Sequence, residues 1–167
     1  MNRRKCTAKY GWQPAGVNHQ LAQRVLSCIF TNVTSATLAA AARFHGHLGP
    51  WLVLGLRAGF HSRRLGGSPF ARKALVWCPA RTPYSCFIDG IQFASGCTLG
   101  KANIRHIPSR RCRVRFASGR SSITLTVRTE LFRWLEQWQD IPETTVERLA
   151  RRIARTPFSL LFEVEHG

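Results

Sequence analysis

Residues 51–60 constrain the fold more than any other stretch of the chain, because nearly every position is apolar or glycine. Pro50 stands directly before this run, and proline suits the first turn of a helix. The pattern therefore predicts a helix that is buried on all sides. Gly55 and Gly59 are four residues apart and share a face, so a second backbone can approach the helix closely there.

The clearest strand signal is a hairpin with arms at residues 112–116 and 123–127 and a turn at Ser118 and Gly119. Apolar residues alternate with polar ones along both arms, which predicts one buried face and one face toward solvent. The solvent face of the first arm carries arginines, at 111, 113 and 115.

The remaining elements are predicted from the spacing of apolar residues and from the positions of glycine, proline and capping residues. Strands are expected at residues 74–78 and 104–107, with an edge strand within 158–164. Helices are expected over residues 18–30, from a capping Ser35 to Phe44, over 85–95 with Gly96 as C-cap, and over 130–139 and 143–155. This order predicts an α+β fold, with a mainly antiparallel mixed sheet and helices packed on one face.

The length of 167 residues suits one domain with a sizeable core. We expect an N-terminal extension over residues 1–33 and a single α+β domain over 34–167. Six cysteines occur without a C-x-x-C pair, and neither a secretion signal nor an apolar run long enough to span a membrane is visible. The chain is therefore predicted to be cytoplasmic, with reduced thiols and no membrane association.

The formal net charge is +17, and it is unevenly distributed. Residues 1–129 hold twenty Lys and Arg, and Asp89 is their only acidic residue. Such a field favours an anionic ligand, nucleic acid or an acidic partner subunit. Arginine outnumbers lysine by 21 to 4, so genome composition is an equally good explanation of the charge.

Two short segments combine glycine with reactive side chains. In the first, His45 and His47 flank Gly46, where a loop lets both imidazoles point the same way to hold a metal or an anion. An isolated H-x-H is more often a pair of capping or solvated histidines. In the second, Cys86 and Asp89 share a helix face near an N-terminus, where the helix field is expected to lower a thiol pKa and stabilise a carboxylate. Capping by Asp89 and plain burial of Cys86 are the alternatives.

The helix at 85–95 leads into Gly96-Cys97-Thr98-Leu99-Gly100-Lys101, which does not match a Walker A motif. Gly96 and Gly100 allow close backbone approach, Lys101 could fix a negative group, and Cys97 is a candidate nucleophile. Along a continuous helix Cys86 and Cys97 lie roughly 16 Å apart. They would then serve different sites, unless the helix breaks or a second subunit contributes.

Three motifs make the chain resemble the FmdE family, which takes its name from formylmethanofuran dehydrogenase. They are F-H-G-H at 44–47, D-x-I-Q at 89–92 and G-C-T-x-G-K-x-N at 96–103. Many members have H-G-H-x-C-P, whereas Gly49 takes the cysteine position in this chain. The chain is similar to a subgroup with H-G-H-L-G-P and S-C-x-I-D-G-I-Q, so Cys86 is expected to replace the missing thiol. The cysteines of the C-terminal zinc finger of many relatives have no counterparts in this sequence, so that finger is expected to be absent.

The resemblance implies an α+β fold, often dimeric, with a polar cavity that can hold a metal. We therefore expect a metal-binding accessory subunit or small enzyme of formylmethanofuran dehydrogenase-type (molybdenum or tungsten) one-carbon redox metabolism. Its partners would be a second copy or dehydrogenase subunits. A divalent metal such as Zn is expected at His45, His47 and Cys86. Catalytic roles are expected for Asp89, Cys97 and Lys101, with Lys101, Gly96 and Gly100 holding a cofactor.

A basic nucleic-acid-binding module is the main alternative, motivated by the arginine face of the hairpin. Because Phe116 lies on the opposite face, the stacking aromatics of common RNA-binding surfaces are expected to be missing. A docking subunit for an acidic partner is a further alternative.

Overall fold

A computed structural model describes residues 33–137 and 142–167. The helices of this part are α2 (Ser35–His45), α3 (Pro50–His61), η1 (Ser62–Leu65), α4 (Cys86–Ser95), η2 (Leu99–Lys101), α5 (Thr129–Glu136), α6 (Glu143–Arg155) and α7 (Phe158–Leu161). The helix expected over 18–30 lies outside the described residues, as does nearly all of the expected extension. Within the described part, no helix has the length and apolar character needed to cross a membrane.

The sheet consists of β1 (Lys73–Cys78), β2 (Ile104–Pro108), β3 (Arg113–Ser118), β4 (Ser121–Val127) and β5 (Phe162–His166), in the order β2-β1-β3-β4-β5. The β1–β2 pairing is parallel and the other three are antiparallel. The expected hairpin forms from β3 and β4, with Val114 opposite Leu125 and Phe116 opposite Ile123. All four side chains are buried, as the alternation predicts.

Helix α3 lies at the centre of the molecule and is buried over almost its whole length, as expected from its sequence. Pro50 occupies its first turn. Gly55 and Gly59 let α4 cross at backbone distance: a Cβ on Gly55 would lie 2.1 Å from the Phe87 carbonyl oxygen, and one on Gly90 of α4 would lie 2.1 Å from that of Leu52. Side chains larger than hydrogen are therefore excluded at this crossing.

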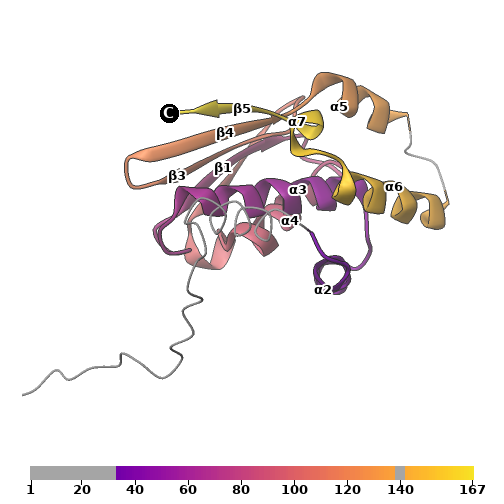
Figure 1. Cartoon of the computed structure of the whole chain (residues 1–167), viewed down its shortest axis with the longest axis horizontal. Helices are drawn as coiled ribbons and strands as arrows, with labels where there is room; N and C mark the ends of the chain where they lie inside the picture. Colours follow the sequence, from indigo (N-terminus) through magenta and orange to yellow (C-terminus); the bar gives the residue numbers. More distant parts are fainter. Residues whose placement is uncertain (1–32, 138–141) are drawn as a thin grey trace, which may run out of the picture.

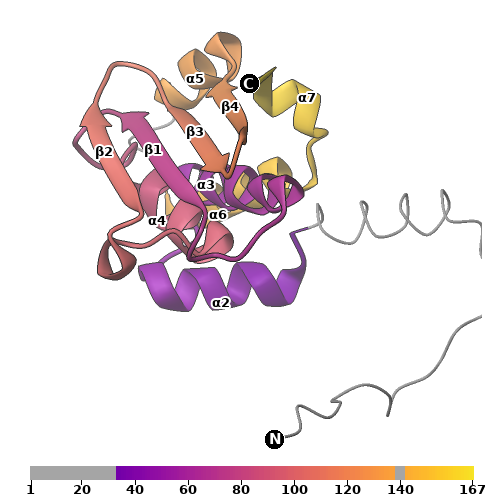
Figure 2. The same ribbon diagram turned by 90° about the vertical axis from the view of Figure 1, so that its left-hand side faces the viewer.

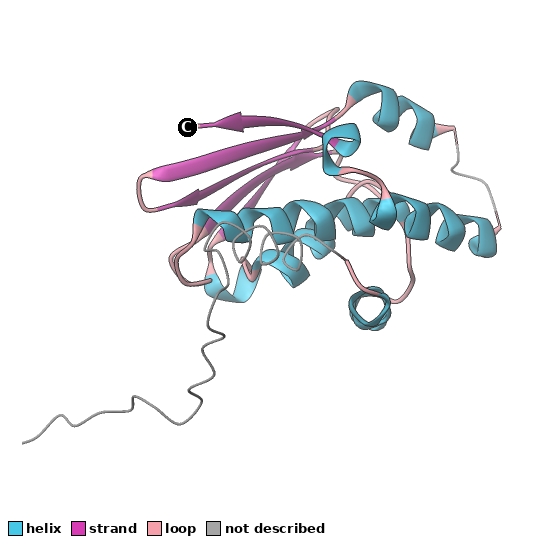
Figure 3. Cartoon of the chain, viewed as in Figure 1, coloured by secondary structure: helices cyan, strands magenta, loops and turns pink. Residues whose placement is uncertain are grey.

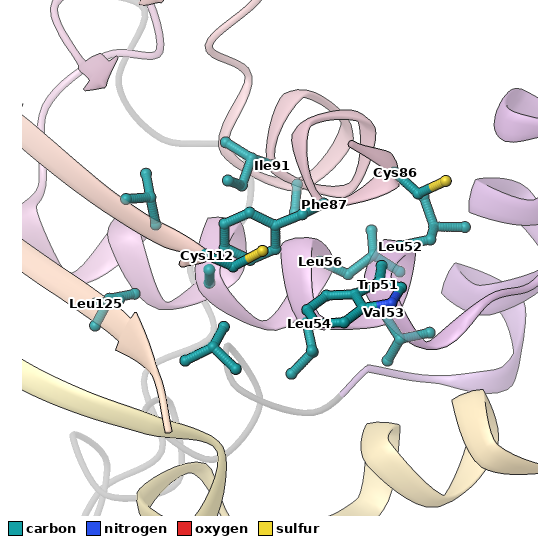
Figure 4. Packing of buried hydrophobic residues seen from close by; sticks show 14 of the residues in the cluster. Trp51, Leu52, Val53, Leu54, Leu56, Cys86, Phe87, Ile91, Cys112 and Leu125 are labelled. Atoms are coloured by element: carbon teal, nitrogen blue, oxygen red, sulfur yellow. The ribbon is translucent and has the colours of Figure 1, made fainter. Parts of the chain in front are cut away.

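The molecule has three layers. Figures 1 and 2 show the sheet covering α3 and α4, with α2 on the far side of these helices, and in Figure 1 α6 extends beyond the end of the sheet, below α5. Figure 3 shows the same separation of strands and helices. Figure 4 shows the buried side chains between the layers, among them Leu52, Phe87 and Leu125. The expected α+β class, with helices packed on one face of a mainly antiparallel mixed sheet, is confirmed.

Several local boundaries differ from the sequence-based expectation, and the helix expected over 130–139, for example, ends at Glu136. The N-cap of α2 is Thr34 rather than Ser35, because Thr34 is extended and its hydroxyl accepts a hydrogen bond from the Thr37 N–H. The hairpin turn lies one residue later, at Gly119 and Arg120, since Ser118 still pairs with Ser121. Residues 158–161 form α7 after Pro157, so the edge strand begins only at Phe162.

Candidate functional site

The end of α2 places the two histidines. His45 is the last residue of α2, and Gly46 caps it with φ at 101°, a conformation that residues with a side chain rarely adopt. The chain reverses there, so the His45 and His47 rings lie 4.8 Å apart between centroids. Two residues later Gly49 begins α3 as its N-cap. The glycine between the histidines is therefore what brings their rings together.

Helix α4 supplies the partner of His45. Asp89 lies in the first turn of α4, and its Oδ2 is 2.7 Å from His45 Nδ1. The His45 side chain is 10% exposed and that of Asp89 is 38% exposed, so the bond lies at the edge of the protein interior. The acidic residue that stands alone in the first 129 positions thus binds an imidazole 44 residues away in sequence.

The second nitrogen of His45 has no partner. His45 Nε2 is buried and forms no hydrogen bond with any described residue. A carboxylate that accepts from Nδ1–H fixes the tautomer of the ring and leaves the Nε2 lone pair available. A buried unpaired polar atom costs free energy, so His45 Nε2 is poised to bind a group from outside the described chain.

Gly49 lies beside the other histidine. His47 is exposed, and a Cβ built on Gly49 would lie 3.0 Å from His47 Nε2. Since Gly49 has an ordinary extended backbone, a larger residue meets no conformational barrier there. A cysteine at this position, as in the H-G-H-x-C-P pattern, would place its Cβ next to the His47 ring.

Cys86 does not have the expected environment. It begins α4, but its side chain is buried, and that burial, together with the charge of Asp89, raises the pKa of its thiol. The expectation of a lowered pKa is therefore wrong, because burial and the charge of Asp89 outweigh the backbone hydrogen bond at Cys86, which lowers the pKa. Among the described residues, no three His, Cys, Asp or Glu side chains are grouped so as to hold one metal ion. The structure places His45 beside His47 and, separately, in a hydrogen bond with Asp89, and Cys86 is not grouped with them as a further metal ligand.

The second motif lies at the other end of α4. The helix is continuous from Cys86 to Ser95, so Cys97 is separated from Asp89 by roughly 12 Å. Cys97 is fully buried, and its thiol donates to the Arg72 carbonyl oxygen at 3.5 Å. Burial raises its pKa, so the thiol stays protonated at neutral pH. Burial outweighs the Ser95 hydroxyl and the charges of Arg72 and Lys101, which lower the pKa, and the expected catalytic role of Cys97 stays a prediction.

Gly96, Gly100 and Lys101 of this motif have different structural environments. Gly96 is the left-handed C-cap of α4, as expected, with φ at 73°. A Cβ on Gly100 would meet nothing within 4 Å, so no close approach requires glycine there. Lys101 is half-buried, and its Nζ lies 5.3 Å from the centroid of the Phe70 ring. These three residues lie away from the histidines, and their expected cofactor role stays a prediction.

Asn103 holds the loop of the second motif, a role that the sequence-based reasoning missed. Its side-chain oxygen accepts from the Thr98 N–H, and its amide nitrogen donates to the carbonyl oxygens of Pro69 and Arg72. Arg72 in turn donates to the carbonyl oxygen of Ser95. The available signal was the asparagine of the G-C-T-x-G-K-x-N pattern, which this geometry explains as a structural residue.

The open face of the sheet also holds a residue that the sequence-based reasoning missed. Trp77 of β1 pairs with Arg113 of β3 on the face that carries the arginines. The Arg113 guanidinium lies 4.5 Å from the centroid of the Trp77 ring. The expectation that this face lacks a stacking aromatic is therefore wrong.

Comparison with known proteins agrees with the motifs. A protein-family model described as "FmdE, Molybdenum formylmethanofuran dehydrogenase operon" matches residues 44–163, which is most of the chain. The match begins at Phe44, next to His45, and includes all the motif residues described above. A search of curated proteins found no match.

Proposed function

The chain belongs to the FmdE family, and from this premise we propose that it binds a divalent metal ion through His45 and His47. One observation carries the proposal: His45 Nε2 is buried without a partner among the described residues, while Asp89 holds Nδ1. Metal-binding histidines characteristically donate a hydrogen bond from the N–H of their other ring nitrogen to a carboxylate in this way.

The two imidazoles of His45 and His47 suit a metal ion that binds nitrogen ligands, such as Zn²⁺. This chain offers two imidazoles, and no third ligand is grouped with them in residues 33–137 and 142–167. Zinc sites usually have three or four protein ligands. A metal held here would therefore keep positions open for water, a substrate or a side chain of a second copy. In such a site a divalent metal supplies Lewis acidity.

The protein's own residues prepare the site in two ways. Asp89 fixes the tautomer and orientation of His45, so it is a positioning residue. Gly46 fixes the reversal that brings His47 beside His45. His47 is exposed whereas His45 is nearly buried, so one ligand faces solvent and the other the interior. This arrangement gives a small ligand access from the side of His47.

The proposal is tested by titrating the full chain with Zn²⁺ in a calorimeter and by measuring bound metal by mass spectrometry. We expect saturable binding that is lost in His45→Ala. We expect it to weaken by about 10–100-fold in Asp89→Asn, the usual effect of removing a ligand's hydrogen-bond partner. His106→Ala, which removes an exposed histidine of β2, is the matched control and should bind like the unaltered protein. Equal Zn²⁺ affinities of the His45→Ala and His106→Ala variants would contradict the proposal.

In its wider role, we propose that the protein is an accessory subunit or small enzyme of formylmethanofuran dehydrogenase-type redox metabolism. The description of the matching family model supports this link. An incomplete ligand set among the described residues of one chain also fits a protein that works as a homodimer or with partner subunits. Size-exclusion chromatography with and without Zn²⁺ tests the homodimer: a metal-dependent dimer supports it, and a monomer under both conditions contradicts it.

Nucleic-acid binding on the open face of the sheet is a second candidate function. Trp77 under the Arg113 guanidinium supplies an aromatic surface beside positive charge, the combination that binds single strands. Fluorescence anisotropy with a labelled single-stranded RNA at several salt concentrations tests it. Steeply salt-dependent binding that Trp77→Ala weakens would support this function. Absence of binding at low salt would eliminate it.

A further inference from the structure

A second candidate site lies at the opposite end of α3 from His45 and Asp89. A cavity of about 890 Å³ is lined there by residues of α3, α6, α7 and β5, together with Val33 and Arg128. Helix α3 has 12 residues, so its two ends lie roughly 18 Å apart. The cavity is thus separate from the proposed metal site, and its volume falls within the range of small-molecule pockets.

The charge of this cavity is strongly one-sided. Among the described residues that line it, four are arginines and only Glu163 is acidic. The arginines are Arg57, Arg64, Arg128 and Arg155. Within the described part of the chain, ion pairs form only at His45–Asp89 and Arg151–Glu147, so none of the four is paired with a carboxylate.

The rest of the chain offers these arginines no acidic partner either. Residues 1–32 contain no Asp or Glu, so wherever they lie they add no carboxylate. Asp140 is the one acidic residue of the second undescribed stretch, and it precedes the start of α6. The cavity adjoins the other end of α6, at Arg155, roughly 18 Å along that helix. The positive charge is therefore left for a ligand from outside the chain.

Arg57 and His61 give the cavity a fixed inner wall. Arg57 is 8% exposed, and its Nη1 donates to the carbonyl oxygens of Ile153 and Ala154 at the end of α6. No described residue accepts from its Nε or Nη2. His61 is 9% exposed and stacks on Phe158, with ring centroids 4.0 Å apart. Its Nδ1 is buried and has no partner among the described residues.

We propose that this cavity binds a small organic molecule through its phosphate or carboxylate groups. Guanidinium groups match the oxygen geometry of both anions and bind them with two parallel hydrogen bonds. A concave wall of one charge also raises the local concentration of anions of the opposite charge. Four arginines with one carboxylate among them suit a ligand that carries more than one negative group. This ligand is independent of the metal at His45 and His47.

The test is calorimetric titration of the full chain with pyrophosphate and, separately, with citrate, at constant ionic strength. The variant Arg64→Gln/Arg155→Gln removes two exposed cavity arginines without touching the buried Arg57. The variant Arg110→Gln/Arg111→Gln removes the same charge from the exposed loop between β2 and β3 and is the matched control. Circular dichroism checks that both variants fold.

We expect saturable binding of one probe, weakened at least about tenfold by the cavity variant and less than about twofold by the control. Tighter binding of pyrophosphate assigns a phosphate ligand, and tighter binding of citrate assigns a carboxylate. If the cavity variant does not fold, the imidazole NMR signals of His61 in the unaltered protein decide, because either probe should shift them. The proposal is overturned if neither probe saturates, if both variants lose equal affinity, or if the His61 signals do not respond.

Discussion

At the scale of single residues, Asp89 shows that a lone acidic residue in a basic segment can point to a candidate site. It has twenty cationic residues around it in sequence, yet its partner is the imidazole of His45. The sequence identifies Asp89 as the lone acidic residue of a basic segment and predicts that it lies near the N-terminus of a helix. In the structure it lies in the first turn of α4. The sequence did not predict that His45 is the partner of Asp89, because this contact joins α2 and α4 across 44 residues and depends on the tertiary structure.

A gain-of-function substitution tests whether the histidines form a metal site. We predict that Gly49→Cys tightens Zn²⁺ binding by at least about tenfold, because its Cβ lies 3.0 Å from His47 Nε2 and a thiolate is a strong zinc ligand. His47 must move by a few tenths of an ångström to admit it. Gly100→Cys is the control, since it adds a thiol in open space at the other motif. Equal affinities of the two variants would argue against a site at His47.

The buried His61 predicts a pH-dependent stability. Burial, with the nearby charges of Arg64, His166 and Arg57, lowers its pKa from 6.5 to about 4. The unfolded chain therefore binds a proton more readily between pH 6.5 and 4, and stability falls as the pH falls through that window. From this residue alone we expect the free energy of unfolding to be roughly 2 kcal/mol lower at pH 5 than at pH 7.

Urea unfolding at both pH values measures this effect. His61→Phe keeps a ring against Phe158 and removes the titrating group, so its stability should change less between pH 7 and pH 5. A pH dependence identical to that of the unaltered protein would show that His61 is not responsible.

At the scale of elements, the crossing of α3 and α4 fixes the position of Asp89. Gly55 and Gly90 allow the two backbones to touch, and Phe87 and Ile91 of α4 then reach the core. Sequence predicted the close approach at Gly55 and Gly59 but not the helix that makes it, since α3 and α4 are separated by β1. The same limitation applies to Trp77, whose face is set by pairing with β3.

A glycine substitution tests this crossing. In an unconstrained helix, Gly→Ala stabilises by about 1 kcal/mol. In Gly55→Ala the new methyl group would lie 2.1 Å from a backbone oxygen of α4, so we expect a loss of about 3 kcal/mol or more. Urea unfolding measures it. Gly100→Ala has open space around it and should stay within about 0.5 kcal/mol of the unaltered protein. Unchanged or increased stability of Gly55→Ala would contradict the packing described here.

The cysteines show where local pattern and packing disagree. Their places near a helix end and in a glycine-bearing loop favour reactive thiols, but burial raises the pKa of both Cys86 and Cys97. Burial depends on which elements cover α4, and that information lies in the tertiary structure. The α+β class, the hairpin and most helix boundaries could be predicted because they depend on local period and on proline and glycine positions.

At the scale of the whole molecule, α3 separates two candidate sites of different chemistry. Its N-terminal end carries the imidazole pair with Asp89, and its C-terminal end carries a cavity lined by arginines. Arg57 is the one charged residue between Trp51 and Phe60, and this charge in an apolar run is a feature of the sequence from which the second candidate site could have been predicted, but was not. The net charge of +17 is thus concentrated in part around a defined cavity rather than spread only over the surface.

The most direct test of the central claim is a crystal structure of the protein soaked with Zn²⁺, with anomalous diffraction recorded on both sides of the zinc absorption edge. We predict an anomalous peak within bonding distance of His45 Nε2 and His47, with the bond from His45 to Asp89 retained. A fully soaked crystal with no peak at these histidines, or with zinc only at other positions, would contradict the claim.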